Sequence, residues 1–441
     1  MRNNTDTIAA IATGRGEGGI AIIRISGENA LKTLKSVFRP SSKRAEYNHG
    51  QMLYGRIFDR EGRVIDEVMA VYFASPRTYT REDVCEIHTH GGIVADKVLE
   101  ECVHAGARPA EAGEFTYRAF LNGRIDLSEA EAVMQLIGAK SDSAARASVR
   151  QLTGGVSANI GAFKEKLKYL VSLIDAAADF PEEIDEEVTS QTVRSDAKAL
   201  YDEISLISDK RQARIMNKGA SVVIAGRPNV GKSSIMNALL RYERSIVTDI
   251  PGTTRDTVNE SLSINGVAFT LTDTAGIRET GDIIEKIGVD RAQAGIKEAD
   301  CVILVLDASR PLNQEDEELL SQKDERYILV ANKDDIKTGD FEACIKLSAK
   351  TGEGLDRLTE AIYERISPGE QDEKLSSLRH IECAERAKAA LERLISSPSG
   401  TYLDLMRDDL TEALMCLGEI TGENVTEDVI DSVFERFCVG K

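Results

Sequence analysis

The chain has 441 residues, of which 42% are hydrophobic and 29% are charged, and this suits a globular protein of roughly two to four domains. We expect no membrane protein, because no uncharged apolar stretch reaches the ~18 residues that cross a bilayer, and no secretory signal peptide, because the first residues lack an apolar core. The 55 Lys and Arg against 74 Asp and Glu give a formal net charge of −19, which excludes a protein coated with basic patches.

Such a surface admits nucleic acid only at a local basic site or with the help of a partner. The seven cysteines are odd in number, scattered and never arranged as Cys-x-x-Cys, which disfavours both a disulfide framework and a zinc ribbon. We therefore expect a chain that works in the reducing cytoplasm.

The first region, residues 1–119, is predicted to be a small α+β unit. Val, Ile and aromatic residues favour strands at 18–25, 67–74 and 83–89, and helical spacing follows over 94–103. Two motifs here are rejected as sites. Gly14-x-Gly16-x-x-Gly19 has dinucleotide spacing but precedes a strand instead of a helix, and His88-Thr-His90 lacks a third metal ligand at a suitable spacing.

Residues 120–216 and 371–441 are predicted to be helical. Apolar residues from Ile160 to Ile174 recur at steps of three and four, which indicates a long amphipathic helix that Pro181 should end. A second stripe runs from Ile381 to Leu394, and the acidic run 185–187 is interpreted as a solvated face. Because the ~70 residues of the second segment would make a marginal core alone, we expect the two segments to pack together.

The intervening residues 217–370 would then form an inserted α/β domain. Short β-branched runs at 221–225, 268–272, 301–306, 327–331 and 343–347 alternate with helical patterns such as 234–240 and 355–366. This alternation predicts a mainly parallel, doubly wound sheet covered on both faces.

The first of these strands runs into Gly226-Arg-Pro-Asn-Val-Gly-Lys-Ser233, a phosphate-binding loop with a strand before it and a helix after it. Successive N–H groups and the helix N-terminus can bind phosphates, with Lys232 reaching the β and γ phosphates and Ser233 binding Mg²⁺. Three further elements follow in the order of a guanine-nucleotide switch: Asp273-Thr-Ala-Gly276, Asn332-Lys-Asp-Asp335 and Ser348-Ala-Lys350. The Asp335 carboxylate can accept two hydrogen bonds from guanine, a donor pair that adenine lacks.

The segment 248–256 lies where a threonine should close on Mg²⁺ and the γ-phosphate. Ile277 follows the Asp-Thr-Ala-Gly motif, at the place where Ras carries the glutamine that orients the attacking water. An isoleucine cannot do this, so another group must. The candidates that the residues alone leave open are Asn229, Arg255, Arg278, Glu279 and Glu285.

Over its whole length the sequence resembles the MnmE (TrmE) family of tRNA modification GTPases, in the TrmE-Era-EngA-like superfamily. The resemblance rests on 226–234, Gly252-Thr-Thr-Arg-Asp256, Asp273–Gly276, the insertion of a GTPase domain in a helical domain, and the final Cys438-Val-Gly-Lys441. It implies GTP hydrolysis that uses a potassium ion at a G-domain dimer interface instead of an arginine.

The resemblance also implies the site residues. It places K⁺ on Asn229, Thr248, Ile250 and Thr253, Mg²⁺ on Ser233 and Thr254, and the catalytic glutamate at Glu285. The residues expected around GTP are Asn229, Val230, Gly231, Lys232, Ser233, Ser234, Thr248, Asp249, Ile250, Pro251, Gly252, Thr253, Thr254, Asp273, Thr274, Ala275, Gly276, Asn332, Lys333, Asp335, Ser348, Ala349 and Lys350.

The resemblance also implies an N-terminal domain that dimerises and binds 5-formyl-tetrahydrofolate or a related one-carbon folate. The matching positions are Arg24, Glu82, Arg124 and Lys441, with arginine at 124 where other members carry lysine. A homodimer would act with MnmG, a partner that carries FAD, on the wobble uridine U34 of certain tRNAs, adding an aminomethyl or carboxymethylaminomethyl group to C5. Cys438 would lie near this chemistry. The competing hypothesis is a ribosome-assembly GTPase, but that class usually appends a compact basic RNA-binding module, which this sequence lacks.

Overall fold

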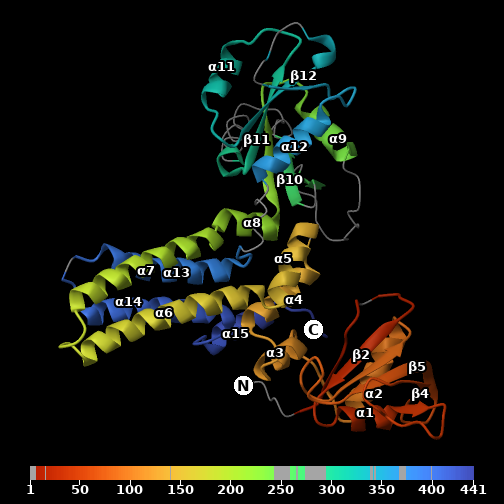
Figure 1. Cartoon of the computed structure of the whole chain (residues 1–441). Coiled ribbons are helices and arrows are strands. Elements are labelled where there is room, and N and C mark those ends of the chain that lie inside the picture. Colours follow the sequence, from red (N-terminus) through yellow and green to blue (C-terminus); the bar gives the residue numbers. More distant parts are fainter. Residues whose placement is uncertain are drawn as a thin grey trace, which may run out of the picture. The chain divides into compact units, whose positions relative to one another are not determined.

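The computed structural model describes residues 6–14, 16–139, 141–242, 259–264, 267–273, 295–337, 341, 344–366, 374–398 and 400–441 (Figure 1). The chain divides into two compact units, one of residues 1–134, 151–165 and 414–441 and the other of residues 135–150 and 166–413. The division passes through four helices: α4 (Leu127–Ile137), α5 (Asp142–Leu152), α6 (Gly155–Asp179) and α14 (Leu403–Thr421). None of the described helices combines the length and apolarity needed to cross a membrane.

The first unit contains a seven-stranded sheet in the order β3-β4-β5-β6-β2-β1-β7. Its strands are β1 (Ile8–Ile11), β2 (Ala21–Ser26), β3 (Phe38–Pro40), β4 (Met52–Phe58), β5 (Val64–Phe73), β6 (Val84–Thr89) and β7 (Arg108–Pro109). Only the β1–β7 pair is parallel among these strand pairs. The helices α1 (Ala30–Val37) and α2 (Ile93–His104) bury apolar residues in the same core as the strands, which confirms the small α+β unit. The expected strand at 18–25 begins only at Ala21, because a glycine loop precedes it.

The loop that carries the rejected dinucleotide motif leads into a strand, β2, and contacts Gly91. The Gly91 N–H donates to the Gly18 carbonyl at 3.0 Å, and a Cβ on Gly91 would lie 2.5 Å from the same oxygen. This close backbone approach requires glycine at position 91, whereas no atom lies within 4 Å of a Cβ placed on Gly14, Gly16 or Gly19 of the motif. Of the two histidines, His90 lies with Nδ1 2.8 Å from Asp66 Oδ1, and His88 Nε2 lies 3.5 Å from Glu86.

The C-terminal residues complete the first unit. Two short helices, α3 (Glu114–Leu121) and α15 (Glu427–Phe434), belong to this part of the unit. An apolar cluster joins Leu127 and Ala130 to Phe434 and Phe437. Ala112 and Val439 then pair as an antiparallel bridge. The tail is therefore held on residues of the segment 112–130.

In the second unit, α7 (Glu186–Ile207) packs against α13 (Leu378–Ser396), and α8 (Lys210–Lys218) follows α7. The Arg194 guanidinium donates to the carbonyls of Leu394, at 3.0 Å, and Ser397, at 2.6 Å. Helices from the two predicted segments thus pack together as expected. The α6 helix ends at Asp179, before Pro181, and Asp185 of the acidic run accepts hydrogen bonds from Glu187 and Val188 N–H as the N-cap of α7.

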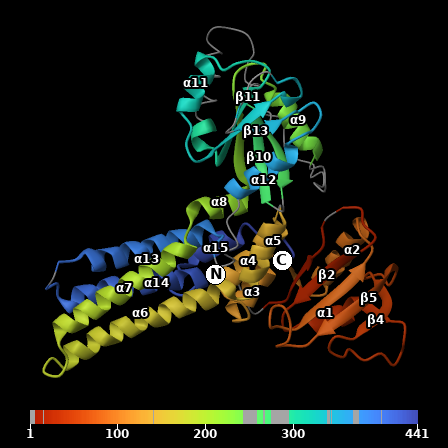
Figure 2. The same cartoon turned by 45° about the horizontal axis from the view of Figure 1, so that its top comes forward.

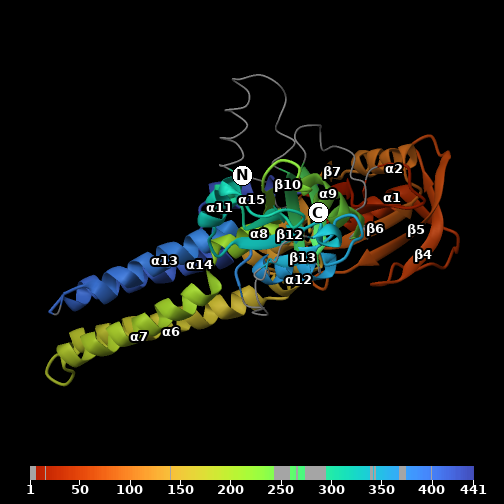
Figure 3. The same cartoon turned by 90° about the horizontal axis from the view of Figure 1, so that it is seen from above.

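The same unit contains a six-stranded sheet in the order β13-β12-β11-β8-β10-β9. The strands are β8 (Ala220–Ala225), β9 (Asn259–Ile264), β10 (Val267–Asp273), β11 (Cys301–Asp307), β12 (Tyr327–Asn332) and β13 (Ile345–Leu347). All pairs are parallel except the β9–β10 hairpin, so the predicted parallel sheet is confirmed, with an antiparallel edge that the sequence pattern did not indicate. The helices α9 (Lys232–Tyr242) and α12 (Leu355–Ile366) cover one face and α11 (Gln314–Ser321) covers the other (Figures 2 and 3).

Candidate functional site

The predicted nucleotide motifs lie at one edge of the six-stranded sheet. In a parallel sheet the carboxyl ends of neighbouring strands meet at the same edge, where open α/β sheets bind their ligands. Here β8 leads into the loop 226–231, β12 ends at Asn332, β13 precedes Ser348, and β10 ends at Asp273. The strand order therefore brings together segments that are far apart in the sequence.

The loop 226–231 has the backbone of a phosphate cradle. Gly226, Asn229 and Gly231 have φ angles of +141°, +65° and +99°, which turn the chain sharply between β8 and α9. A Cβ on Gly231 would overlap the Asn332 amide, so glycine is required there by space as well as by backbone conformation. Lys232 is only 6% exposed, and its Nζ donates to the carbonyls of Gly226 and Arg227, each at 2.8 Å.

Asn332 links the phosphate loop to the loop after β13. Its Nδ2 donates to the Val230 carbonyl at 2.8 Å, and its Oδ1 accepts from the Ala349 N–H at 3.1 Å. The side chain is nearly buried, at 2% exposed. Because both ends of the amide are used, Asn332 fixes the spacing between the two loops.

Asp307, at the end of β11, is a site residue that the sequence analysis missed. Lys333 Nζ donates to Asp307 Oδ2 at 2.7 Å and to the Asn229 carbonyl at 3.1 Å, so this lysine ties the phosphate loop to β11. Burial alone raises the pKa of Asp307, but the hydrogen bonds from Lys333 and Ser309 outweigh it and hold the pKa below its usual value. The only sequence signal was an acidic residue directly after a buried strand.

The expected guanine end adjoins a pocket. The Ser348 hydroxyl donates to Asp335 Oδ1 at 2.9 Å, which orients this carboxylate beside the loop 348–350. A pocket of about 570 Å³ lies between α9 and this loop, and Ser234, Asn237, Arg241 and Lys350 contribute to its lining. Asp335 itself is not among the residues that line this pocket, but its carboxylate, oriented by Ser348, can accept a donor pair from a base.

Several predicted residues lie outside the described residues. They are the segment Thr248, Asp249, Ile250, Pro251, Gly252, Thr253 and Thr254, then Thr274, Ala275 and Gly276, and finally Glu285. Arg255, Ile277, Arg278 and Glu279 are outside them as well, and for Asp273 the structure gives only its place at the end of β10. Their expected roles stay predictions.

A second candidate site lies in the first unit. Arg24, Arg124 and Lys441, three of the four expected folate positions, line one pocket of about 260 Å³ with Tyr79. Ile125, Val133 and Leu152 form its apolar wall. Three cations beside an aromatic ring and an apolar wall suit a planar ligand that carries carboxylates.

Tyr79 and Glu86 hold the two arginines of this pocket, and the sequence analysis named neither. The guanidinium carbons of Arg24 and Arg124 lie 5.6 and 4.7 Å from the centre of the Tyr79 ring, and Arg24 Nε donates to Glu86 Oε1 at 3.0 Å. Cation–π contacts and one ion pair therefore orient both guanidinium groups.

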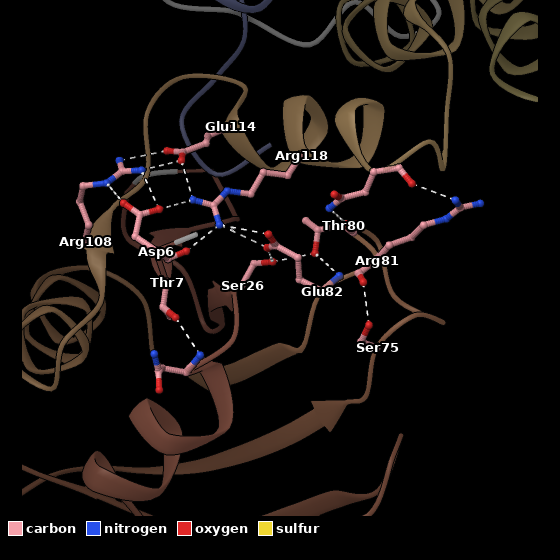
Figure 4. Close-up of polar contacts among 12 residues, drawn as sticks. Asp6, Thr7, Ser26, Ser75, Thr80, Arg81, Glu82, Arg108, Glu114 and Arg118 are labelled. Atoms are coloured by element: carbon pink, nitrogen blue, oxygen red, sulfur yellow. Dashed lines mark hydrogen bonds and ion pairs between the residues drawn. The ribbon is translucent and has the colours of Figure 1, made fainter. Parts of the chain in front are cut away.

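The fourth expected position, Glu82, belongs to a buried ion network and not to the pocket lining. Its carboxylate accepts from the Ser26 hydroxyl at 2.7 Å and from Arg118 Nη1 at 3.2 Å (Figure 4). Arg118, only 1% exposed, also donates to Asp6 at 2.6 Å and to Glu114 at 2.9 Å. Burial alone raises the pKa of Asp6 and of Glu114, but hydrogen bonds from Arg108 and Arg118 hold both below their usual values.

The C-terminal tail carries Lys441 to the pocket. The Lys441 carbonyl accepts from the Phe115 N–H at 3.2 Å, and Gly440 has a φ of +97° beside the Ile11 carbonyl, where a side chain would overlap the backbone. Cys438 is exposed on the same tail with a free thiol, and its carbonyl accepts from the Gly113 N–H at 3.4 Å.

The chain is similar to known proteins over almost its whole length. A family model described as the MnmE helical domain matches residues 127–438, and one described as the GTP-binding protein TrmE N-terminus matches residues 7–124. The tRNA modification GTPase MnmE of Finegoldia magna is 42% identical over 452 residues, covering 99% of this chain and 100% of that protein. The protein of the same name from Clostridioides difficile is 43% identical over 456 residues, covering 99% of both chains.

Among solved structures, the chain is similar to the G domain of the T. maritima FeoB iron transporter, with 32% identity. The match covers 33% of this chain and 98% of that chain, and its TM-score is 0.26. It is also similar to Aquifex aeolicus Era bound to GDP and AlF₄⁻, with 28% identity, 39% and 66% covered, and a TM-score of 0.28.

Proposed function

The chain belongs to the MnmE family of tRNA modification GTPases, and we propose that its GTP hydrolysis drives the addition of an aminomethyl or carboxymethylaminomethyl group to C5 of the wobble uridine U34 in certain tRNAs. In this proposal a partner of the MnmG type carries FAD and completes the reaction in the cytoplasm. The observation that carries the nucleotide half is that three separate segments, represented by Lys232, Asn332 and Ser348, meet at one sheet edge.

As a member of this family the chain binds GTP and Mg²⁺. We assign the phosphates to the loop 229–234, the metal to Ser233 and Thr254, and guanine to Asp335 with the loop 348–350. The backbone bends at Asn229 and Gly231 support the first assignment, and the Ser348–Asp335 hydrogen bond supports the last. Mg²⁺ would supply charge neutralisation at the phosphates, while the loop N–H groups and Lys232 hold them in place.

For hydrolysis we propose a potassium site on Asn229, Thr248, Ile250 and Thr253 that is completed when two G domains meet in a homodimer. Asn229 is exposed and its carbonyl is held by Lys333, so its amide oxygen is free to take a cation beside the phosphates. The cation would supply the positive charge that an arginine brings in other GTPases. Glu285 would orient the attacking water indirectly.

We further propose that the pocket at Arg24, Arg124 and Lys441 binds the one-carbon folate. Its three cations match the carboxylates of such a ligand, and its apolar wall suits the fused ring. Glu82 would act through the loop it anchors, since its carboxylate is turned toward Ser26 and Arg118. Cys438, exposed on the tail that delivers Lys441, is the residue we assign to the tRNA chemistry.

GTP turnover measured in KCl and in NaCl tests the hydrolytic part, with oligomeric state followed in parallel by light scattering. We expect turnover far higher in KCl, and Asn229→Ala should abolish the difference between the two salts. Equal rates in the two salts would eliminate the cation site.

The modification itself is tested by mass spectrometry of wobble nucleosides from cells that lack the protein. Loss of the C5 substituent is expected. An unchanged nucleoside profile would favour the ribosome-assembly alternative.

A further inference from the structure

The acidic character of the chain is unevenly distributed. Residues 1–124 carry 17 Lys and Arg against 16 Asp and Glu, so the remaining residues carry 38 against 58. A long polyanion would therefore meet least repulsion on the N-terminal part of the first unit.

Within that part, one segment between Glu28 and Glu46 is purely basic. It contains Lys32, Lys35, Arg39, Lys43 and Arg44, and no acidic residue. All five side chains are exposed, two on α1, one on the edge strand β3 and two in the turn that follows. We call these five residues the basic edge.

The basic edge is not neutralised by its own protein. Across the described residues, no ion pair involves any of the five, whereas Arg56 and Arg63 nearby pair with Glu67 and Asp59, each at 2.7 Å. Two of the cations lie over aromatic rings instead. The guanidinium carbon of Arg39 is 4.3 Å from the centre of the Phe58 ring, and Lys35 Nζ is 5.1 Å from the centre of the Tyr47 ring. These contacts position the cations and leave them free to bind an anion.

The sheet register adds a reason for an external anion. Arg39 on β3 lies directly opposite Arg56 on β4, and like charges in this position repel each other. The negative charge of Glu67 pairs with Arg56 and not with Arg39. An anionic ligand over Arg39 would relieve the repulsion that remains.

We propose that the basic edge binds the phosphate backbone of the tRNA substrate. Cations spread over a helix, an edge strand and a turn follow a chain of phosphates better than they would enclose one small anion, and the family membership makes tRNA the relevant polyanion. This inference rests on the proposed function, but it concerns RNA binding alone and needs neither GTP turnover nor folate.

The test uses the full-length chain and an unmodified transcript of a tRNA with U34. Its Kd is measured by fluorescence anisotropy between 50 and 200 mM KCl for the wild type, Lys43→Ala/Arg44→Ala and Lys32→Ala/Lys35→Ala. Each phosphate contact contributes about 0.7–0.9 to the slope of log Kd against log [KCl], so each double variant should lower this slope by about 1.4–1.8. The matched control is Lys166→Ala/Lys198→Ala, which removes two exposed charges from α6 and α7 and should leave the slope unchanged.

GTP turnover, measured on the same preparations, should stay at the wild-type rate in all variants. A failure of the proposed GTPase function can therefore be told apart from a failure of RNA binding at the basic edge. An unchanged slope in both double variants of the basic edge would overturn the proposal. The basic edge would then serve only to keep β3 from pairing with strands of other chains. Unchanged RNA binding together with lost binding to vesicles of anionic phospholipid would overturn it in favour of a membrane surface.

Discussion

Asn332 Nδ2 donates to the Val230 carbonyl at 2.8 Å, so a residue at the end of β12 sets the position of a loop that follows β8. This one amide connects the two loops that we assign to phosphate and to guanine, because its oxygen also accepts from the Ala349 N–H. Nucleotide affinity should therefore depend on a side chain that need not touch the phosphates.

Asn332→Ala should lower both nucleotide affinity and the stability of the second unit. It leaves the Val230 carbonyl and the Ala349 N–H without this buried partner, and each unsatisfied group costs about 1–3 kcal/mol. We expect affinity for a fluorescent GTP analogue to fall at least about tenfold, together with a lower denaturation midpoint. Asn48→Ala, which removes an exposed amide that bonds to Gln51, is the control and should change neither quantity.

Arg118→Met should destabilise the first unit strongly. It removes the cation at the centre of the network and leaves Glu114 buried with Arg108 as its remaining charged partner, and breaking a buried pair in this way costs about 3–5 kcal/mol. Urea unfolding followed by circular dichroism would measure the loss. Arg63→Met removes the surface ion pairs with Asp59 and Glu61 and should cost under about 1 kcal/mol. Similar costs for the two variants would contradict a special role for the network.

The stability of the first unit should fall as the pH is lowered. The pKa values of Asp6 and Glu114 are lower in the folded chain than in the unfolded chain. As the pH falls through the ordinary carboxyl range near ~4, the unfolded state therefore takes up protons first, and stability is lost until the folded-state pKa is passed. Asp6→Asn should flatten this acid limb in thermal melts recorded from pH 7 to pH 3. An acid limb as steep as that of the wild type would assign the loss to other carboxylates.

Gly440→Ala should weaken folate binding while leaving GTP hydrolysis intact. A methyl group there overlaps the Ile11 carbonyl, and the φ of +97° disfavours alanine, so the tail must shift and move Lys441 away from the pocket. Isothermal titration with 5-formyl-tetrahydrofolate would detect the change. Gly62→Ala has a similar φ of +78° with no atom within 4 Å of the added Cβ, and it should bind the folate as the wild type does.

The secondary structure around the nucleotide site was predictable because its signals are local. A buried run such as 301–306 is short enough to be a strand, and the glycine loop before α9 specifies a turn and a helix start within a few residues. The partners of the motifs were not predictable in the same way. Asp307 gains its role only when the parallel register of β11 and β12 brings Lys333 beside it.

The first unit shows the same limit more strongly. Arg24 and Arg124 were expected from the family resemblance, yet nothing in the sequence indicated that both would lie near one ring, that of Tyr79. Glu82 was expected with them, but the sheet places its carboxylate toward Arg118. A motif names a position, whereas the direction of the side chain depends on how distant segments pack.

The bridge between Ala112 and Val439 has a consequence for synthesis on the ribosome. The residues that line this pocket range in the sequence from Arg24 to Lys441. A nascent chain can therefore complete the whole GTPase domain before the last lining residue has been made. A chain that lacks only its last residue, Lys441, should therefore still turn over nucleotide but bind the proposed folate more weakly.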